Sequence, residues 1–180
     1  MLEAKLTTGN SQILMAVKSG KCIRFEEGKT RPMGRNASGV RGVRLKDNND
    51  EVVGMLSVND MDSDILVVSE NGYGKRSKLD DYRITNRGGK GVKTISITDK
   101  TGNLVSIKNV SDGDDLMIIN KSGIAIRMQV EDLRVMGRAT QGVKVISLKD
   151  GDSIAAVAKV MKNDDEIEDI NDIEFTGDAV

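Results

Sequence analysis

The sequence of 180 residues predicts an all-β protein that contains three propeller-like blades, each with four short strands. The first observation behind this prediction is a unit of about 50 residues that recurs three times, with a turn glycine at positions 20, 72 and 123. The second is that period-two alternation and β-branched residues dominate each copy, whereas no segment before residue 160 has the apolar stripe of an amphipathic helix. Four short strands in a unit of this length are typical of a propeller blade.

Each copy opens with a β-hairpin. An apolar strand is expected first, over residues 13–17, 65–68 and 116–119. The glycine that follows this strand permits the positive φ of a tight turn, and the Ser or Asn beside it suits the same turn. A second strand with a basic residue is expected after the turn, over residues 22–25, 74–76 and 125–128.

The second half of each copy contains a glycine-and-arginine segment followed by two more strands. These segments span residues 33–40, 86–92 and 136–143. A third strand is expected to leave each segment, at residues 43–45, 92–97 and 143–148. A polar turn then leads to a closing strand, which ends at Val58, Val110 and Val160.

These repeats place the three blades at residues 11–62, 63–111 and 112–160. Residues 1–10 precede the first blade, and Leu2 to Leu6 are expected to form a strand that comes in from a missing preceding blade. Residues 161–180 contain too few apolar side chains to join a core, so we expect a disordered acidic tail.

The formal net charge of −1 hides a strong segregation of charge along the chain. Residues 161–180 hold eight of the 28 acidic residues and one of the 27 basic residues, so residues 1–160 keep 26 basic and 20 acidic residues, a net charge of +6. A basic body with an acidic tail is typical of proteins that bind nucleic acid and restrain that binding. The alternative is a tail that only solvates the protein.

The composition excludes several kinds of site. The chain has no histidine and a single cysteine, which rules out an internal disulfide framework, a zinc finger and a Ser-His-Asp or Cys-His nucleophile. Cys22 is expected to be a small buried residue of a strand. The sequence shows neither a signal peptide nor an apolar run of the roughly 18 residues that cross a bilayer, so we expect a cytoplasmic protein.

Basic side chains recur in the glycine-and-arginine segments, at the same point of every copy. Closing the blades around an axis would align these clusters along one rim, where arginine forks and lysine ammonium groups match phosphate oxygens. Glycines in the segments let backbone N–H groups approach an anion closely. The residues expected to bind DNA are Arg31, Arg35, Arg41, Arg44, Lys75, Arg76, Arg83, Arg87, Gly88, Gly89, Lys90, Lys93, Arg127, Arg134, Arg138 and Lys144.

The expected ligand is duplex DNA rather than a single strand. Two tyrosines, two phenylalanines and no tryptophan are too few for a platform on which bases stack. No segment resembles a recognition helix for the major groove, so base sequence is not expected to be read. Contact with the backbone of bent duplex is the mode that fits the sequence.

Tyr82 needs separate consideration, because Asp80, Asp81 and Arg83 beside it superficially provide acids for a metal and a neighbouring cation. The corresponding loops of the other two copies contain no tyrosine, and nothing nearby supplies the preorganised surroundings of a nucleophile. We therefore expect no catalytic residue and no metal ligand in this chain.

The glycine-and-arginine segment of the second copy carries a family resemblance. Residues 86–91, Asn-Arg-Gly-Gly-Lys-Gly, closely resemble Gln-Arg-Arg-Gly-Gly-Lys-Gly, the box of the C-terminal domain of the bacterial DNA gyrase A subunit. The Met-Gly-Arg segments at 33–35 and 136–138, the string at 71–76 and the acidic tail are also similar to that domain. The sequence departs from the box at Thr85 and Asn86, and it has three blades where the family usually has six.

This resemblance implies a β-pinwheel, a propeller-like ring in which neighbouring blades exchange a strand and DNA winds around the rim. It also implies a part in ATP-dependent negative supercoiling by a type IIA topoisomerase, with ATP and Mg bound elsewhere in the parent complex and no cofactor in this chain. The implied partners are duplex DNA, the rest of the gyrase A subunit, and the gyrase B subunit, in the bacterial cytoplasm near the nucleoid. Because three blades leave open edges, we also expect either self-association through the end blades or an N-terminal strand that folds back onto its own blade.

Two alternative functions stay open from the sequence. The first is the related, box-poor wrapping domain of the topoisomerase IV A subunit. The second is an RCC1-like propeller that serves as a platform for protein partners, for which DNA binding should be absent even at low salt.

Overall fold

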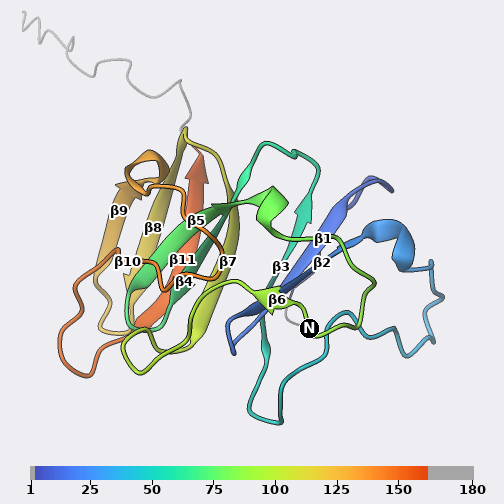
Figure 1. The fold of residues 1–180 in the computed structure, drawn as a ribbon, viewed down its shortest axis with the longest axis horizontal. Helices are drawn as coiled ribbons and strands as arrows, with labels where there is room; N and C mark the ends of the chain where they lie inside the picture. The colour runs from blue at the N-terminus through green and yellow to red at the C-terminus, as the bar shows by residue number, and fades with distance from the viewer. Residues whose placement is uncertain (1–2, 162–180) are drawn as a thin grey trace, which may run out of the picture.

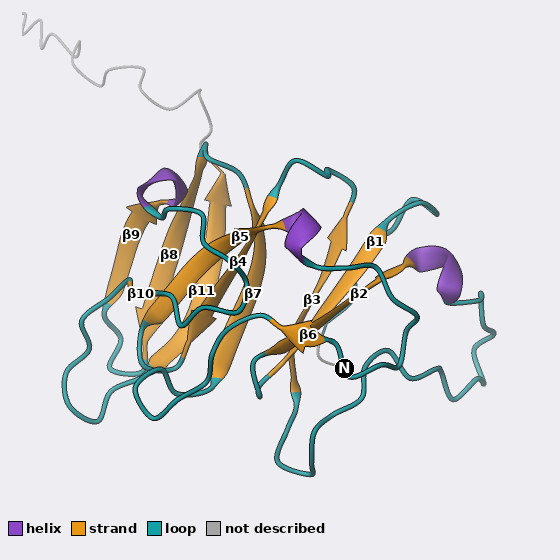
Figure 2. Ribbon diagram, in the orientation of Figure 1, coloured by secondary structure: helices purple, strands orange, loops and turns teal. Residues whose placement is uncertain are grey.

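The computed structural model describes residues 3–161, and the fold is all-β, as the sequence predicts (Figures 1 and 2). Three antiparallel sheets follow one another in chain order, with one short 3-10 helix in each repeat. Within the described residues, no helix is long and apolar enough to cross a membrane. The predicted acidic tail lies outside the described residues, except for Met161 at the end of the last strand.

The elements follow the three repeats. The first repeat forms β1 (Gln12–Val17), β2 (Lys21–Glu26), η1 (Glu27–Lys29) and β3 (Val52–Val58). The second forms β4 (Asp64–Ser69), β5 (Tyr73–Lys78), η2 (Leu79–Asp81), β6 (Val92–Lys93) and β7 (Leu104–Val110). The third forms β8 (Asp114–Asn120), β9 (Ala125–Gln129), η3 (Val130–Asp132), β10 (Val143–Lys144) and β11 (Ile154–Met161). The predicted hairpins are confirmed, because the turn glycines of all three repeats have positive φ, +79° at Gly20, +79° at Gly72 and +86° at Gly123.

Neighbouring sheets exchange a strand. The first sheet has the order β3-β1-β2-β6, although β6 belongs to the second repeat, and Val92 of β6 stands opposite Cys22. The second sheet has the order β10-β5-β4-β7, and Val143 of β10, from the third repeat, stands opposite Gly74. The third sheet has the order β11-β8-β9 in the described part of the chain, so only the first two sheets have the four predicted strands. This exchange is the one that the resemblance to a β-pinwheel implied.

The third strand expected in each repeat is shorter than predicted or absent. β6 and β10 cover only two residues each, and residues 43–45 form no strand. The reason is that this strand pairs with the preceding repeat and not with its own. Within residues 3–161, no repeat precedes the first one, so residues 43–45 have no acceptor.

The strand predicted for residues 2–6 is wrong for the part that the structure describes, because residues 3–8 have no regular secondary structure. The carboxylate of Glu3 accepts a hydrogen bond from the backbone N–H of Met55 in β3 (3.0 Å). Lys5 in turn pairs with Glu3 (2.8 Å). In the described part of this segment, a side chain and not a backbone ladder therefore makes this contact with β3.

Two apolar cores lie between the sheets. The core between the first and second sheets includes Leu14, Cys22, Ile65, Tyr82 and Leu104. The core between the second and third sheets includes Leu66, Val68, Val110, Leu116 and Ile118. All six residues of β4 are buried, because the second sheet packs on both of its faces. Cys22 is buried as predicted, and burial raises the pKa of its thiol to about 12.

Candidate nucleic-acid interface

The outer strands β6 and β10 place lysines at the edge of the molecule. Neighbouring sheets meet at β3, β7 and β11, whereas β6 and β10 lie at the opposite edges of their sheets. Lys93 in β6 and Lys144 in β10 are both exposed. A rigid duplex can reach this outer edge without entering the space between the sheets.

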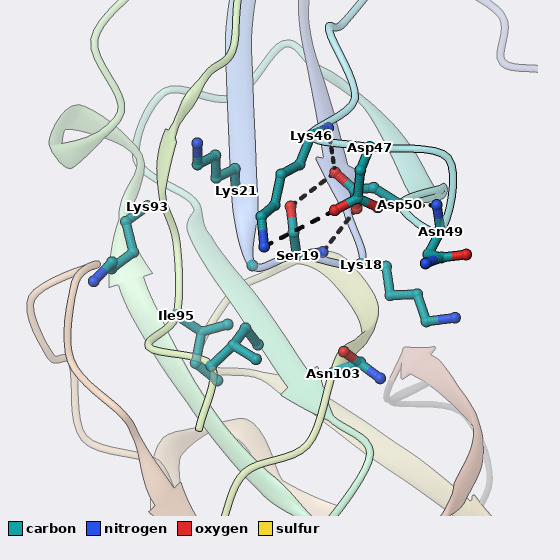
Figure 3. A pocket seen from close by; sticks show the side chains of 12 residues that line it. Lys18, Ser19, Lys21, Lys46, Asp47, Asn49, Asp50, Lys93, Ile95 and Asn103 are labelled. Carbon is teal, nitrogen blue, oxygen red and sulfur yellow. Dashed lines mark hydrogen bonds and ion pairs between the residues drawn. The ribbon is translucent and has the colours of Figure 1, made fainter. Parts of the chain in front are cut away.

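Four lysines line a hollow of about 620 Å³ between the first hairpin turn and the second repeat (Figure 3). Lys21 stands opposite Lys93 in the register of β2 and β6, and Lys18 and Lys46 complete the set. Lys18 pairs with Glu51 (3.2 Å). Lys46 lies 4.0 Å from Asp47, which lines the hollow together with Asp50. Four lysines therefore face two acids, and the lining keeps a net positive charge that attracts an anion.

Asp50 fixes the wall of this hollow. Its carboxylate accepts hydrogen bonds from the backbone N–H groups of Ser19 and Lys46 (both 2.9 Å) and from the Ser19 hydroxyl (2.8 Å). Burial raises the pKa of Asp50, but these hydrogen bonds outweigh burial and hold the pKa below its ordinary value. The carboxylate therefore stays ionised and holds the turn.

Three lysines of this hollow, Lys18, Lys21 and Lys46, were not predicted from the sequence. None of them recurs in all three copies: the place of Lys18 is taken by Glu70 in the second repeat, and that of Lys21 by Tyr73 and Ile124 in the other two. The signal that identifies Lys21 is its pairing with Lys93, which is visible only once the strand exchange is known.

Arg87 and Arg138 lie at the joints between repeats, that is, where the glycine-and-arginine loop of one repeat packs against the preceding repeat. Arg87 donates to the carbonyls of Lys29 (Nε, 2.9 Å) and Arg41 (Nη1, 3.1 Å). Arg138 makes the same two bonds one repeat further on, to Asp81 (2.9 Å) and to Lys93 (2.8 Å). Both side chains are half-buried, so each fixes its loop to the preceding repeat while part of the guanidinium faces solvent.

Several other predicted residues are exposed on the loops beside these joints. They are Arg31, Arg35, Arg41, Arg44, Arg83, Lys90 and Arg134. The two glycines of the box-like segment are half-buried. The N–H of Gly88 donates to the carbonyl of Gly42, and the carbonyl of Gly89 accepts from the N–H of Arg44 (2.8 Å). Contrary to the expectation from the sequence, the Gly88 N–H is therefore occupied by the protein and does not face an anion.

Lys75 and Arg76 must be removed from the predicted surface. Lys75 is 0% exposed, and its ammonium donates to the Gly137 carbonyl (2.6 Å) and the Thr140 hydroxyl (3.2 Å). Arg76 is 8% exposed; it donates to the carbonyl of Leu133 and pairs with Asp64 (3.6 Å) and Asp112. Both side chains join the second repeat to the third, because β5 is covered by the following repeat.

Arg127 is the counterpart of Arg76 in the third repeat, and its side chain is 56% exposed. It pairs with Asp115 of the neighbouring strand β8 (2.7 Å). It therefore lies on the open face of the third sheet, away from the glycine-and-arginine loops with which it was grouped.

Tyr82 is part of the core between the first two sheets. Its side chain is fully buried, and its hydroxyl lies 2.6 Å from the hydroxyl of Thr94. Burial raises the pKa of the phenol well above its ordinary value. These contacts give Tyr82 a packing role and leave its oxygen out of reach of a duplex at the surface.

Comparison with known proteins shows the family to which this chain belongs. The family model described as "DNA gyrase C-terminal domain, beta-propeller" matches residues 11–59, 63–111 and 114–161. The chain is 45% identical to the DNA gyrase A subunit of Staphylococcus epidermidis over 166 residues, which cover 92% of this chain and 18% of that protein. It is 46% identical to the DNA gyrase A subunit of Staphylococcus aureus over 178 residues, or 98% of this chain and 20% of that protein. The chain thus spans about a fifth of the length of the gyrase A subunits that it matches.

Two solved structures have the same fold. The structure titled "Structure of DNA gyrase A C-terminal domain" superposes with a TM-score of 0.77 at 30% identity, over 84% of this chain and 51% of that one. The "Crystal structure of the C-terminal domain of DNA topoisomerase IV" superposes with a TM-score of 0.81 at 23% identity, over 87% of this chain and 49% of that one. At that identity, the second likeness concerns the fold alone.

Proposed function

Because this chain belongs to the family of DNA gyrase C-terminal domains, we propose that it binds and wraps duplex DNA along the outer edge of its blades, as part of the DNA gyrase A subunit. The observation that carries this proposal is the position of Lys93 and Lys144 on the exchanged strands, at the same edge of successive sheets. A duplex that follows this edge meets a cluster of cations at each joint. The contacts are to phosphates, so the binding is independent of base sequence.

The larger activity belongs to the proposed parent enzyme. There the wrapped duplex is presented to a cleavage site elsewhere in the complex, and ATP and Mg serve negative supercoiling outside this chain. The partners are then the rest of the gyrase A subunit, together with the gyrase B subunit, in the bacterial cytoplasm near the nucleoid. A wrapping domain of the topoisomerase IV A subunit is the second candidate, supported by the similar fold of that C-terminal domain. The identity of 45% to 46% with gyrase A subunits favours the first.

Binding to duplex DNA should depend steeply on salt. If the chain engages about six phosphates, the logarithm of the binding constant should fall against the logarithm of salt concentration with a slope of roughly −5. Fluorescence anisotropy of a labelled duplex at several salt concentrations measures this slope. A slope flatter than about −2 would show that the basic edge is not the binding surface. No binding at low salt would instead support a protein-interaction platform.

The lysines of the hollow at the first joint should contribute more to DNA binding than lysines elsewhere in the chain do. Lys21→Ala combined with Lys93→Ala removes two charges from the outer edge and should flatten the salt slope by about two. Lys5→Ala combined with Lys108→Ala is the matched control, because these lysines line a different hollow between the inner strands. The control should keep the wild-type slope. Equal changes in the two double variants would mean that only total charge matters.

The acidic tail should compete with phosphate for the same cations, since it carries eight of the acidic residues. Deleting residues 162–180 should therefore tighten DNA binding, and the gain should be greatest at low salt, where charges are least screened. The same anisotropy titration compares the full chain with the truncated one. A truncated chain that binds no better at low salt would assign the tail another role.

A further inference from the structure

The two joints differ in the side chains that they place at the outer edge. At the first joint, between the first and second repeats, Lys21 of β2 stands opposite Lys93 of β6 (Figure 3). At the second joint, between the second and third repeats, Tyr73 of β5 stands opposite Lys144 of β10. Opposite residues of an antiparallel pair have side chains on the same face of the sheet, with Cβ atoms about 5 Å apart. A tyrosine therefore takes the place of a lysine beside an exposed cation of the outer edge.

The ring of Tyr73 lies among cations and not in a core. The ammonium of Lys100 lies 5.5 Å from the centroid of this ring. Lys100 is exposed, and its backbone is held beside the turn between β4 and β5, because the amide of Asn71 donates to the carbonyls of Asp99 (3.1 Å) and Lys100 (3.2 Å). Within residues 3–161, Tyr73 is half-buried and belongs to none of the apolar clusters. The ring is therefore part of the basic edge.

The hydroxyl of Tyr73 is available to a ligand. In the part of the chain that the structure describes, it makes no hydrogen bond, whereas the hydroxyl of Tyr82 lies 2.6 Å from that of Thr94 in the core. The backbone of Tyr73 is fixed, because its carbonyl accepts a hydrogen bond from the Ser69 hydroxyl (3.1 Å). Tyrosine hydroxyls are among the neutral groups that bind the phosphate oxygens of DNA. The second joint thus offers a neutral donor beside two ammonium groups.

The second joint also has fewer cations than the first. Counted from the turn glycine of each repeat, Lys18 is replaced by Glu70, and Lys46 by Thr98. An ion pair with phosphate releases a counterion and so weakens as salt is added, whereas a neutral hydroxyl releases none. A neutral contact therefore matters most at the joint that has fewer lysines.

We propose that Tyr73 is a DNA contact of the second joint, whose hydroxyl donates to a phosphate of the duplex between the ion pairs of Lys100 and Lys144. The contact rests on the proposed function and goes beyond it, since the two joints then hold the duplex by different chemistry. At the first joint, the opposed pair consists of two ammonium groups. At the second joint, the pair combines an ammonium group with a neutral donor. As salt rises, the first joint therefore loses affinity for the duplex faster than the second joint does.

Paired tyrosine variants test this proposal by fluorescence anisotropy of a labelled duplex at several salt concentrations. Tyr73→Phe removes only the hydroxyl. It should weaken binding by roughly tenfold at every salt concentration and leave the salt slope unchanged. Tyr82→Phe is the matched control, because it removes the hydroxyl of a fully buried tyrosine, and it should bind as the wild type does.

Exchanging the opposed residues tests the difference between the joints directly. Tyr73→Lys gives the second joint the residue of the first and should steepen the salt slope by about one. Lys21→Tyr makes the reverse change and should flatten the slope by about one. The variant with both changes should recover the slope of the wild type. Slopes that stay the same in both single exchanges would overturn the assignment of these positions to the duplex.

Nitration with tetranitromethane locates the contact on the protein. In the free chain, the reagent should nitrate Tyr73 and not the fully buried Tyr82, and saturating duplex should protect Tyr73. A wild type that does not bind duplex at low salt would overturn the proposed function and the Tyr73 contact together. If the wild type binds with a steep salt slope but Tyr73→Phe binds equally well, or Tyr73 is nitrated in the complex, only the Tyr73 contact fails. A changed slope in Tyr73→Phe would also overturn it, because the hydroxyl carries no charge.

Discussion

Replacing Arg76 by alanine is expected to lower the free energy of unfolding by about 1–3 kcal/mol. The substitution removes the buried cation beside Asp64, whose side chain is 6% exposed and which keeps its ion pair with Lys78 (3.0 Å). It also leaves the buried Leu133 carbonyl without its guanidinium donor. The Leu133 carbonyl is then desolvated without compensation, whereas Asp64 keeps one cation. Urea unfolding followed by circular dichroism measures the change.

Arg127→Ala is the matched control for this experiment, because Arg127 occupies the same place in the third repeat. Its side chain is 56% exposed and pairs with Asp115, whose side chain is as buried as that of Asp64 (6% exposed). Within the described residues, however, Arg127 donates to no carbonyl of a following repeat, so its loss should cost less stability than the loss of Arg76. If the two variants lose the same stability, the contacts that Arg76 makes with the third repeat do not hold the blades together.

The second large effect is expected at Lys75, whose charge is buried without an acidic partner within hydrogen-bonding distance. Burial lowers the pKa of the ammonium to about 8; the Asp81 carboxylate opposes this shift and Arg138 adds to it. In the unfolded chain, the pKa is near the ordinary value of about 10.4. Between these two values the unfolded state binds more protons than the folded state, so raising the pH stabilises the fold.

The cleanest measure is the difference in unfolding free energy between the wild type and Lys75→Met, which keeps the length of the side chain and removes the charge. From pH 7 to about pH 10.5, the wild type should gain on the order of 3 kcal/mol relative to the variant. Burial also raises the pKa values of Cys22 and Tyr82, which lowers stability at alkaline pH. Both proteins share these two groups, so their effect cancels in the difference. A difference that does not change with pH would mean that Lys75 is not desolvated.

The hairpins could be predicted because their determinants are local. Gly20, Gly72 and Gly123 each follow an apolar run, and the chemistry of a tight turn requires nothing from distant residues. The closing strands were found for the same reason. The basic loops could be located from the repeat alone, since Arg35, Arg87 and Arg138 stand at one position of each copy.

The features that depend on the strand exchange could not be predicted from a single repeat. Val92 and Val143 look like the start of a strand within their own repeat, but their partners lie in the preceding one. Lys75 looks like an exposed cation of a short strand, although Ile23 and Ile126 occupy its place in the other copies and mark that position as apolar. Arg24, Arg76 and Arg127 recur at one position, and the sequence analysis assigns Arg76 and Arg127 to DNA binding. Two of the three instead bind carbonyls of the next repeat.

The strand exchange also affects how this chain folds while a ribosome synthesises it. The strands that arise from the first repeat end at Val58, yet the outer edge of their sheet stays vacant until Val92 and Lys93 have been synthesised. Likewise, the second sheet waits for Val143 and Lys144. Each blade is thus completed by chain that is made after it, so an intermediate cut at residue 62 or 111 exposes an unpaired edge. The nascent protein gains order in overlapping steps, each of which locks the preceding blade while leaving its own edge open.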